Sequence, residues 1–241
     1  MRLLAFGDSL TAGYHHSGAS FSPWAPLLCK LLNVTACDHV GMSGFTTKQL
    51  LNSLDAEEVF DVVPKAWTGL RRQMRTGGPY DVVLIMAGTN DLADKVTTSQ
   101  LLENLVALHD VAHAQGARTV AMTIPESHAA KMVGWLGRAR DDANAAIRTW
   151  ALAQPSDRVK LVDSASLVPF STTNGLWEPD GLHMSQAGYL AFGSLLAPLI
   201  SHWVGATPAD GSPPPPPLSS SSSAPSQPRI PLEFLARLRV V

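Results

Sequence analysis

The sequence has few cysteines and no long hydrophobic run. Cys29 and Cys37 are the only cysteines among 241 residues. They are too few for the disulfide framework of a small secreted domain, so we expect buried free thiols in a reducing compartment. The first apolar run, Leu3-Leu4-Ala5-Phe6, is shorter than the roughly 7–15 residues of a signal peptide. No run approaches the roughly 20 apolar residues of a membrane span. We therefore expect a cytoplasmic protein without a transmembrane segment.

An excess of charge of one sign is also missing. The chain has 18 Lys and Arg residues against 20 Asp and Glu residues, a formal net charge of −2. A surface for nucleic acid or for an anionic membrane normally shows a marked basic excess, so we expect neither partner. Neither the G-x-G-x-x-G pattern nor the Walker A pattern occurs. We therefore expect no dinucleotide or nucleoside triphosphate cofactor.

The composition changes near residue 207. Residues 1–206 are long enough for one domain with a sizeable core. Nine of the 18 prolines fall between Pro208 and Pro231, and five consecutive serines begin at Ser219. Such a segment does not bury enough surface to offset the entropy of ordering it. We expect residues 207–241 to form a disordered Pro/Ser-rich tail, and the sequence leaves open whether this tail contacts another protein.

Apolar runs and helical patterns alternate along the first 206 residues. We expect strands over residues 2–6, 34–40, 81–87, 119–124 and 159–162, and helices over residues 24–32, 99–115, 138–153 and 185–203. Two of the strands are apolar throughout, which is typical of strands buried on both faces of a parallel sheet. Strands and helices in this order form βαβ units. The sequence therefore predicts an α/β fold, a three-layer α/β/α sandwich with a mainly parallel five-stranded sheet.

A serine follows the first predicted strand directly, in Gly7-Asp8-Ser9-Leu10. Ligands of open α/β sheets bind beyond the carboxyl ends of the strands, so the Ser9 hydroxyl stands where a nucleophile can meet a substrate. The alternative is that Asp8 or Ser9 only caps a helix, since both residue types favour that position.

A nucleophilic serine needs a base, and Asp180-Gly181-Leu182-His183 offers one. A turn through Gly181 can bring the Asp180 carboxylate to one imidazole nitrogen of His183 and leave the other nitrogen for Ser9. The same pattern also suits an N-cap beside a surface histidine, because a helix is predicted from residue 185.

Two further residues suit an oxyanion hole. Asn90 follows the predicted strand 81–87, and its amide can donate to an oxyanion. Gly44 precedes an expected helix start at Thr46, where a backbone N–H binds anions well. Gly41 competes with Gly44, but Gly44 lies nearer to that helix. The alternatives are an ordinary turn asparagine and an ordinary loop glycine.

One pair of histidines has the spacing of a zinc protease motif. His109 and His113 lie four residues apart, but Asp110 stands where the motif has its glutamate. We expect both histidines to be solvated on a surface helix, and we expect no metal site.

Taken together, these motifs resemble those of the GDSL esterase and lipase family, in the SGNH hydrolase superfamily. Ser9, Gly44, Asn90 and His183 match its four blocks, and the likeness extends from residue 1 to about residue 204. The resemblance implies a flavodoxin-like fold and metal-independent hydrolysis of esters or thioesters. It also implies an oxyanion hole built from the backbone N–H groups of Ser9 and Gly44 and the side chain of Asn90.

The predicted function is that of a serine esterase acting on a small-molecule ester, with Ser9, His183 and Asp180 as the catalytic residues. Aromatic residues in the expected loops suit short to medium acyl or aryl groups, or simply pack the core: Tyr14, Phe21, Trp24, Trp135, Phe170 and Trp177. Two alternatives remain. The same acyl-enzyme could pass its acyl group to an alcohol, or the protein could be an inactive module that binds an acyl or glycan ligand.

Overall fold

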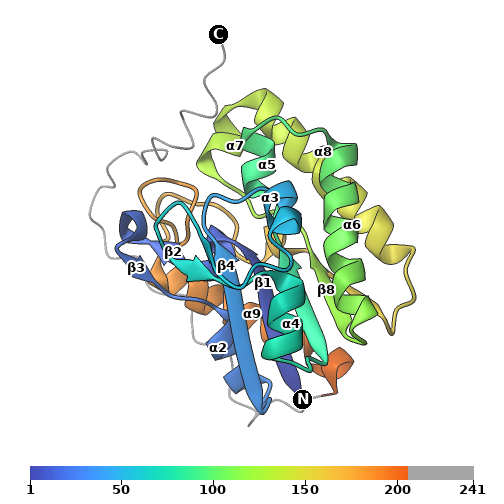
Figure 1. Ribbon diagram of the computed structural model, residues 1–241. Coiled ribbons are helices and arrows are strands. Elements are labelled where there is room, and N and C mark those ends of the chain that lie inside the picture. The colour runs from blue at the N-terminus through green and yellow to red at the C-terminus, as the bar shows by residue number, and fades with distance from the viewer. Residues whose placement is uncertain (206–241) are drawn as a thin grey trace.

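The computed structural model describes residues 1–205 (Figure 1), so the predicted tail of residues 207–241 lies outside the described residues. The main sheet of this part has the strand order β4-β1-β7-β8-β9, and every neighbouring pair is parallel. These strands are β1 (Arg2–Asp8), β4 (Ala36–Met42), β7 (Val82–Met86), β8 (Arg118–Met122) and β9 (Val159–Val162). All five predicted strands are present, and the predicted five-stranded parallel sheet is confirmed.

Helices cover both faces of this sheet, as Figure 1 shows. One face carries α3 (Thr47–Asn52), α4 (Leu70–Thr76), α5 (Thr89–Ala93), α6 (Thr98–Ala114), α7 (His128–Met132) and α8 (Gly134–Leu152). The other face carries α2 (Ala25–Leu31) and α9 (Gln186–Val204), which pack against each other. The α/β/α sandwich is confirmed.

The side chains of β1 show how the two cores form. Leu4 and Phe6 belong to the core under α3–α8, whereas Leu3 and Ala5 belong to the core under α2 and α9. Successive side chains of a strand point to opposite faces, so an apolar strand serves both layers at once. Strand β1 has β4 on one side and β7 on the other, so the strand order reverses direction at β1. In sheets of this kind ligands bind at such a topological switch point, beyond the carboxyl ends of the strands.

The remaining elements are short and lie outside the main sheet. They are α1 (Ser9–Ala12), the hairpin of β2 (Tyr14–His15) and β3 (Ser20–Phe21), the hairpin of β5 (Val59–Phe60) and β6 (Ala66–Trp67), and the 3₁₀ turns η1 (His16–Gly18) and η2 (Ser164–Ser166). The sequence did not predict the β5–β6 hairpin, α4 or α7, because two-residue strands and helices of five to seven residues carry too little periodicity.

The expectation of free thiols is wrong, because Cys29 and Cys37 form a disulfide. Cys29 lies on α2 and Cys37 on β4, the strand that follows this helix, and their Cα atoms are 6.1 Å apart. That separation lies within the usual range for a disulfide. The thiols therefore no longer support a reducing compartment, and the cytoplasmic location stays a prediction.

The two histidines of α6 are not solvated, contrary to expectation. His109 is buried, and its Nδ1 lies 2.8 Å from Thr119 Oγ1 on β8, while His113 Nε2 lies 3.0 Å from the same hydroxyl. Burial lowers the pKa of His109 to about 3, and the neighbouring His113 adds to this effect. The helix face that carries them packs on the sheet, so Thr119 satisfies both rings.

Helix α9 is the one described helix that is long and apolar enough to cross a membrane. Half of its apolar window is buried, and Tyr189, Phe192 and Leu196 are fully enclosed in the core shared with α2. This packing is typical of the core helix of a globular domain.

Candidate active site

The site begins where β1 ends. Ser9 is the first residue of α1, and the Asp8 side chain caps this helix by accepting a hydrogen bond of 3.0 Å from the Leu10 N–H. A Cβ atom on Gly7 would lie 1.9 Å from the carbonyl oxygen of Met86, so only glycine lets β1 approach β7 this closely. Asp8 is therefore a helix cap, as the alternative interpretation of the sequence proposes. Because Asp8 caps the helix, the buried Ser9 takes its first position.

A loop after η2 brings His183 to Ser9. His183 Nε2 lies 3.0 Å from Ser9 Oγ, and His183 Nδ1 lies 2.8 Å from Asp180 Oδ2. The other carboxylate oxygen of Asp180 accepts hydrogen bonds from the N–H groups of Leu182 and His183, at 2.8 and 2.9 Å. Gly181 takes a positive φ of 65° that completes the turn. The three predicted residues therefore meet in one chain of hydrogen bonds.

The pKa values of the Asp180 and Asp8 carboxyl groups are shifted in opposite directions. Burial alone would raise the pKa of Asp180, but the hydrogen bonds and charge of His183 and the N–H of Leu182 outweigh it, and this pKa lies below its usual value. Burial raises the pKa of Asp8 to about 7, although the Leu10 N–H and the charge of His183 oppose the rise. Asp180 is therefore ionised at neutral pH, whereas Asp8 is near its titration midpoint.

Tyr14 lies against the face of the His183 ring. Their ring centroids are 4.2 Å apart with an interplanar angle of 35°. The backbone oxygen of Tyr14 in turn accepts a hydrogen bond of 2.9 Å from the hydroxyl of Tyr189 on α9. The imidazole is thus held by its two ring nitrogens at the edges and by an aromatic ring on one face.

The structure places Gly44 and Asn90 side by side. The Asn90 amide donates a hydrogen bond of 2.9 Å to the carbonyl oxygen of Phe45, the residue after Gly44. Gly44 has a positive φ of 79°, and a Cβ atom there would lie 2.6 Å from the Val62 side chain. Gly41 instead lies under α1, where a Cβ atom would meet the Ala12 nitrogen at 2.2 Å. Gly41 is therefore a packing residue, and the predicted preference for Gly44 fits this arrangement.

Two buried aspartates that were not predicted hold the loop of Gly44. Asp91 accepts hydrogen bonds from the N–H and the hydroxyl of Thr47, at the start of α3. Asp61 accepts hydrogen bonds from the Ser43 N–H at 3.0 Å and from the indole of Trp67 at 2.9 Å. The only signal for Asp91 is its place directly after Asn90, and no pattern pointed to Asp61, because its partners lie in the β5–β6 hairpin.

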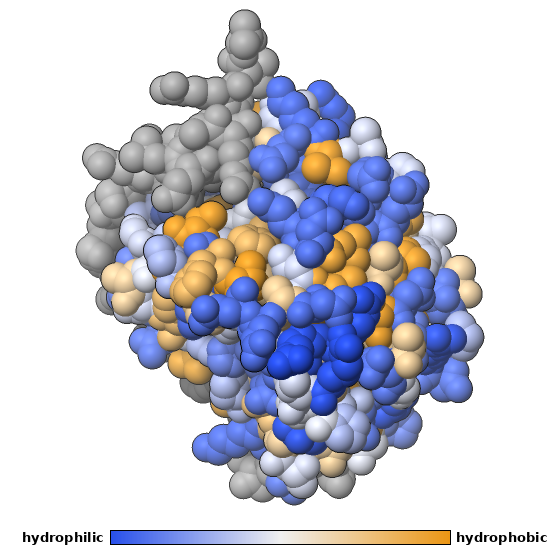
Figure 2. All heavy atoms as spheres, in the orientation of Figure 1, coloured by the Kyte–Doolittle hydropathy of each residue, from blue (hydrophilic) through white to orange (hydrophobic). Residues whose placement is uncertain are grey.

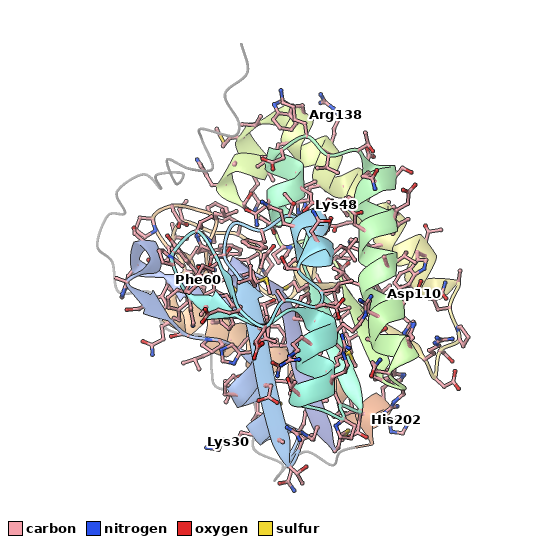
Figure 3. The ribbon with its side chains drawn as sticks, in the orientation of Figure 1. Lys30, Lys48, Phe60, Asp110, Arg138 and His202 are labelled. Carbon is pink, nitrogen blue, oxygen red and sulfur yellow. A yellow bond between two sulfur atoms is a disulfide. The ribbon has the colours of Figure 1, made fainter. Side chains whose placement is uncertain are left out.

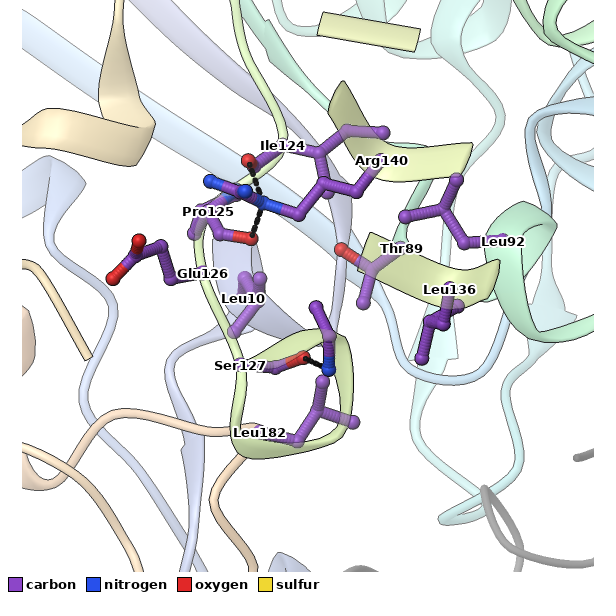
Figure 4. A pocket seen from close by; sticks show the side chains of 11 residues that line it. Leu10, Thr89, Leu92, Ile124, Pro125, Glu126, Ser127, Leu136, Arg140 and Leu182 are labelled. Atoms are coloured by element: carbon purple, nitrogen blue, oxygen red, sulfur yellow. Dashed lines mark hydrogen bonds between the residues drawn. The ribbon is translucent and has the colours of Figure 1, made fainter. Parts of the chain in front are cut away.

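A small cavity adjoins the hydrogen-bonded chain (Figure 4). It is lined by the sequence neighbours of three site residues, namely Leu10, Thr89 and Leu182. Its far wall is mainly apolar and includes Leu92, Ile124, Ala130 and Leu136, with Arg140 and Glu126 at its side. Its volume of about 10 Å³ holds no more than about one water molecule.

The aromatic residues expected around the site have different roles. Trp24, Phe170 and Trp177 are buried in the core under α2 and α9, as the packing alternative states. Among the exposed apolar side chains, two lie on the β5–β6 hairpin, where Phe60 is 58% and Val62 is 53% exposed. Phe60 is labelled in Figure 3, and the same place in Figure 2 shows apolar surface. Val62 is the one of the two that lies beside Gly44.

Among the described residues, His15, His16 and Glu178 are a group of side chains with metal-ligand chemistry. One potential ligand atom from each lies within 4.8 Å of the other two. This His15–His16–Glu178 cluster lies on the β2–η1 segment and on the loop that carries His183.

The fold is shared with solved esterases and lipases. The chain is similar to the lipase/acylhydrolase from Enterococcus faecalis, at 22% identity and a TM-score of 0.59, over 87% of this chain and 99% of that chain. It is similar to the psychrotrophic esterase EstA from Pseudoalteromonas sp., at 20% identity and a TM-score of 0.60, over 85% and 98% of the two chains. An acetyl esterase mutant solved with acetate matches at 18% identity and a TM-score of 0.60, over 85% and 98%. No curated protein matches the chain.

A match to a family model identifies the chain as a hydrolase of carboxylic esters. Residues 5–191 match the model of the GDSL-like lipase/acylhydrolase family. The chain therefore belongs to this family, as its motifs predicted.

Proposed function

We propose that the protein is a serine esterase in which Ser9 is the nucleophile, His183 the base and Asp180 the group that orients the base. The observation that carries this proposal is the continuous path from Ser9 Oγ to His183 Nε2 at 3.0 Å and from His183 Nδ1 to Asp180 at 2.8 Å. Because the ionised Asp180 accepts a hydrogen bond from Nδ1–H, the lone pair of the neutral ring lies on Nε2, toward Ser9.

The reaction then proceeds in two steps. Ser9 Oγ attacks the ester carbonyl carbon while His183 Nε2 takes the hydroxyl proton, and the tetrahedral intermediate expels the alcohol, which takes that proton from His183. A water molecule next gives a proton to His183 Nε2 as its oxygen attacks the acyl carbon, and the tetrahedral intermediate then releases the carboxylic acid while the leaving Ser9 Oγ takes that proton from His183. In both steps Asp180 stabilises the transient imidazolium.

The oxyanion of each intermediate needs donors in place before the reaction. We assign this role to the backbone N–H groups of Ser9 and Gly44 and to the amide of Asn90. The hydrogen bond from Asn90 to the Phe45 carbonyl supports the assignment, because it fixes the amide against the Gly44 loop. Asp91 and Asp61 act as positioning residues, since they hold the two ends of this loop.

For the substrate, we propose esters with short acyl groups. The cavity beside Leu10, Thr89 and Leu182 is about 10 Å³ in volume, so a long acyl chain would require its apolar wall to move. The exposed Phe60 and Val62 suit an apolar or aryl group on the other side of the ester. We therefore expect p-nitrophenyl acetate to be cleaved faster than the butyrate, and the butyrate faster than the octanoate.

The test compares wild type, Ser9→Ala and Ser156→Ala on these three esters. Ser156 is an exposed serine outside the site, and its substitution controls for the loss of a hydroxyl group. We expect Ser9→Ala to lose activity while it keeps the wild-type melting temperature, and Ser156→Ala to stay active. Activity that survives in Ser9→Ala would identify another nucleophile. Absence of activity in wild type, with no labelling of Ser9 by a fluorophosphonate, would favour the inactive binding module.

A further inference from the structure

His15 is a buried histidine whose hydrogen bonding is incomplete. It is 4% exposed, and its Nε2 lies 3.0 Å from the Ser22 hydroxyl. Its Nδ1 is buried and has no hydrogen-bond partner. A buried polar atom without a partner is destabilising, and an ion bound at this nitrogen would satisfy it.

The state of the His15 ring suits metal binding. When Nε2–H donates to Ser22 Oγ, the lone pair of the neutral ring lies on Nδ1. Metal-binding histidines commonly donate their other N–H in this way, which fixes the ring and its tautomer. A metal ion binds the unprotonated nitrogen of a histidine.

The other two members of the cluster come from opposite sides. His16 follows His15 in the chain and is exposed, with its ring centroid 4.5 Å from that of His15. Glu178 comes from the His183 loop, and its carboxylate already accepts a hydrogen bond of 3.0 Å from the His16 backbone N–H. Two imidazoles and one carboxylate therefore converge across a gap between two segments far apart in the sequence.

We propose that His15, His16 and Glu178 bind a divalent transition-metal ion of the zinc type, at a site separate from Ser9. Two nitrogen ligands favour such an ion over Ca²⁺ or Mg²⁺, which prefer oxygen ligands. In a tetrahedral site with bonds of about 2.0–2.2 Å the ligand atoms are about 3.3–3.6 Å apart, so distances that now reach up to 4.8 Å must shorten by at most about 1.5 Å. Rotation of the exposed His16 side chain and of Glu178 provides this movement. Water takes the remaining coordination position.

The ion would connect the two segments that surround the catalytic histidine. The Glu178 N–H donates a hydrogen bond of 2.9 Å to the His183 carbonyl, and Tyr14, the residue before His15, lies against the His183 ring. Binding would therefore hold the β2–η1 segment and the His183 loop together. Because a ligand of the folded state alone stabilises that state, the ion must raise the melting temperature.

The test is Zn²⁺ binding by the full-length protein after removal of metal with a chelator. Isothermal titration calorimetry gives stoichiometry and affinity, and thermal unfolding gives the shift in melting temperature. We expect one Zn²⁺ per chain, and a rise of about 5–10 °C at a Zn²⁺ concentration about 100 times Kd. Mg²⁺ at the same concentration should leave the melting temperature unchanged.

Two variants and two controls make the result specific. Glu178→Gln keeps an acceptor for the His16 N–H but lacks the charge, and His16→Ala removes an exposed ring. Each should weaken Zn²⁺ binding by at least about tenfold. His202→Ala removes an exposed histidine on α9 and should bind as wild type does. Unchanged Zn²⁺ binding by Glu178→Gln and His16→Ala would overturn the proposal. The second control is His183→Ala, which alters the site of Ser9. Zn²⁺ binding that only this variant abolishes would place the ion at His183 and would also overturn the proposal. Neither readout depends on esterase activity.

Discussion

Asp8 is fully buried beside Ser9, and its titration predicts a loss of stability as the pH rises from about 4 to about 7. Burial raises the pKa of this carboxyl from 3.8 to about 7. Between these two values the folded protein holds a proton that the unfolded chain has released. Stability from this group is therefore greatest at low pH and falls as the pH rises toward 7.

The size of the effect follows from the two pKa values. Each unit of difference corresponds to about 1.4 kcal/mol, and the part of the change that lies between pH 5 and pH 8 is about 2–3 kcal/mol. Asp8→Asn removes this titration and keeps a side-chain oxygen to accept the Leu10 N–H. The stability of the variant relative to wild type should therefore improve by about 2–3 kcal/mol from pH 5 to pH 8.

The assay is urea unfolding of both proteins at pH 5, 6, 7 and 8. The comparison between them is essential, because His109 acts in the opposite direction. The pKa of His109 is about 3 in the folded protein and 6.5 in the unfolded chain. Between these two pH values only the unfolded chain binds the proton, so wild type loses stability from His109 as the pH falls below about 6.5. His109 is present in both proteins and cancels in the difference. A constant difference from pH 5 to pH 8 would refute the reasoning and show that Asp8 ionises normally.

Three further predictions concern the loops of the site and the disulfide. Asn90→Ala should lower kcat by about 10²–10³ with a small change in KM, because it removes a donor that we propose for the oxyanion; an unchanged kcat in steady-state kinetics would remove Asn90 from the proposed oxyanion hole. Asp91→Ala should lower the free energy of unfolding by about 2–4 kcal/mol, because the buried N–H and hydroxyl of Thr47 lose their acceptor; urea unfolding measures this, and a loss below about 0.5 kcal/mol would contradict it. Replacing Cys29 and Cys37 together by serine should cost about 2–3 kcal/mol, as expected for a disulfide between residues eight apart; equal stability of wild type and variant, with and without reductant, would show that the thiols are not paired in solution.

The sequence predicted the repetitive part of the fold well. Strand β7 is apolar throughout, β8 ends in an apolar run, and long helices such as α6 have a clear apolar period, so these elements appear within two residues of their predicted bounds. Helix α8 begins at Gly134, four residues before the prediction, because Gly134 and Gly137 hide its first turn. Strand β1 extends to Asp8, since its last residues pair with Gly41 and Met42.

The candidate site was predictable where a residue's chemistry coincides with its place after a strand or in the loop before the last helix. Ser9 meets the first condition, Asp180 and His183 meet the second, and the structure brings the three side chains together. Asp61 and the disulfide were not predictable, because each depends on a partner that only the folded chain brings near. The His15–His16–Glu178 cluster was missed for the same reason, since Glu178 is 162 residues from His16.

The hydrogen bond between Ser9 and His183 joins residues 174 positions apart. Contacts of such long range carry a large loop-closure entropy, which slows the folding of a domain that depends on them. The proposed nucleophile lies on α1 and its proposed base lies in the loop before α9, with every strand of the main sheet between or before them in the chain. A fragment that stops before the His183 loop would keep the serine without its base, and we expect such a fragment to be inactive toward esters.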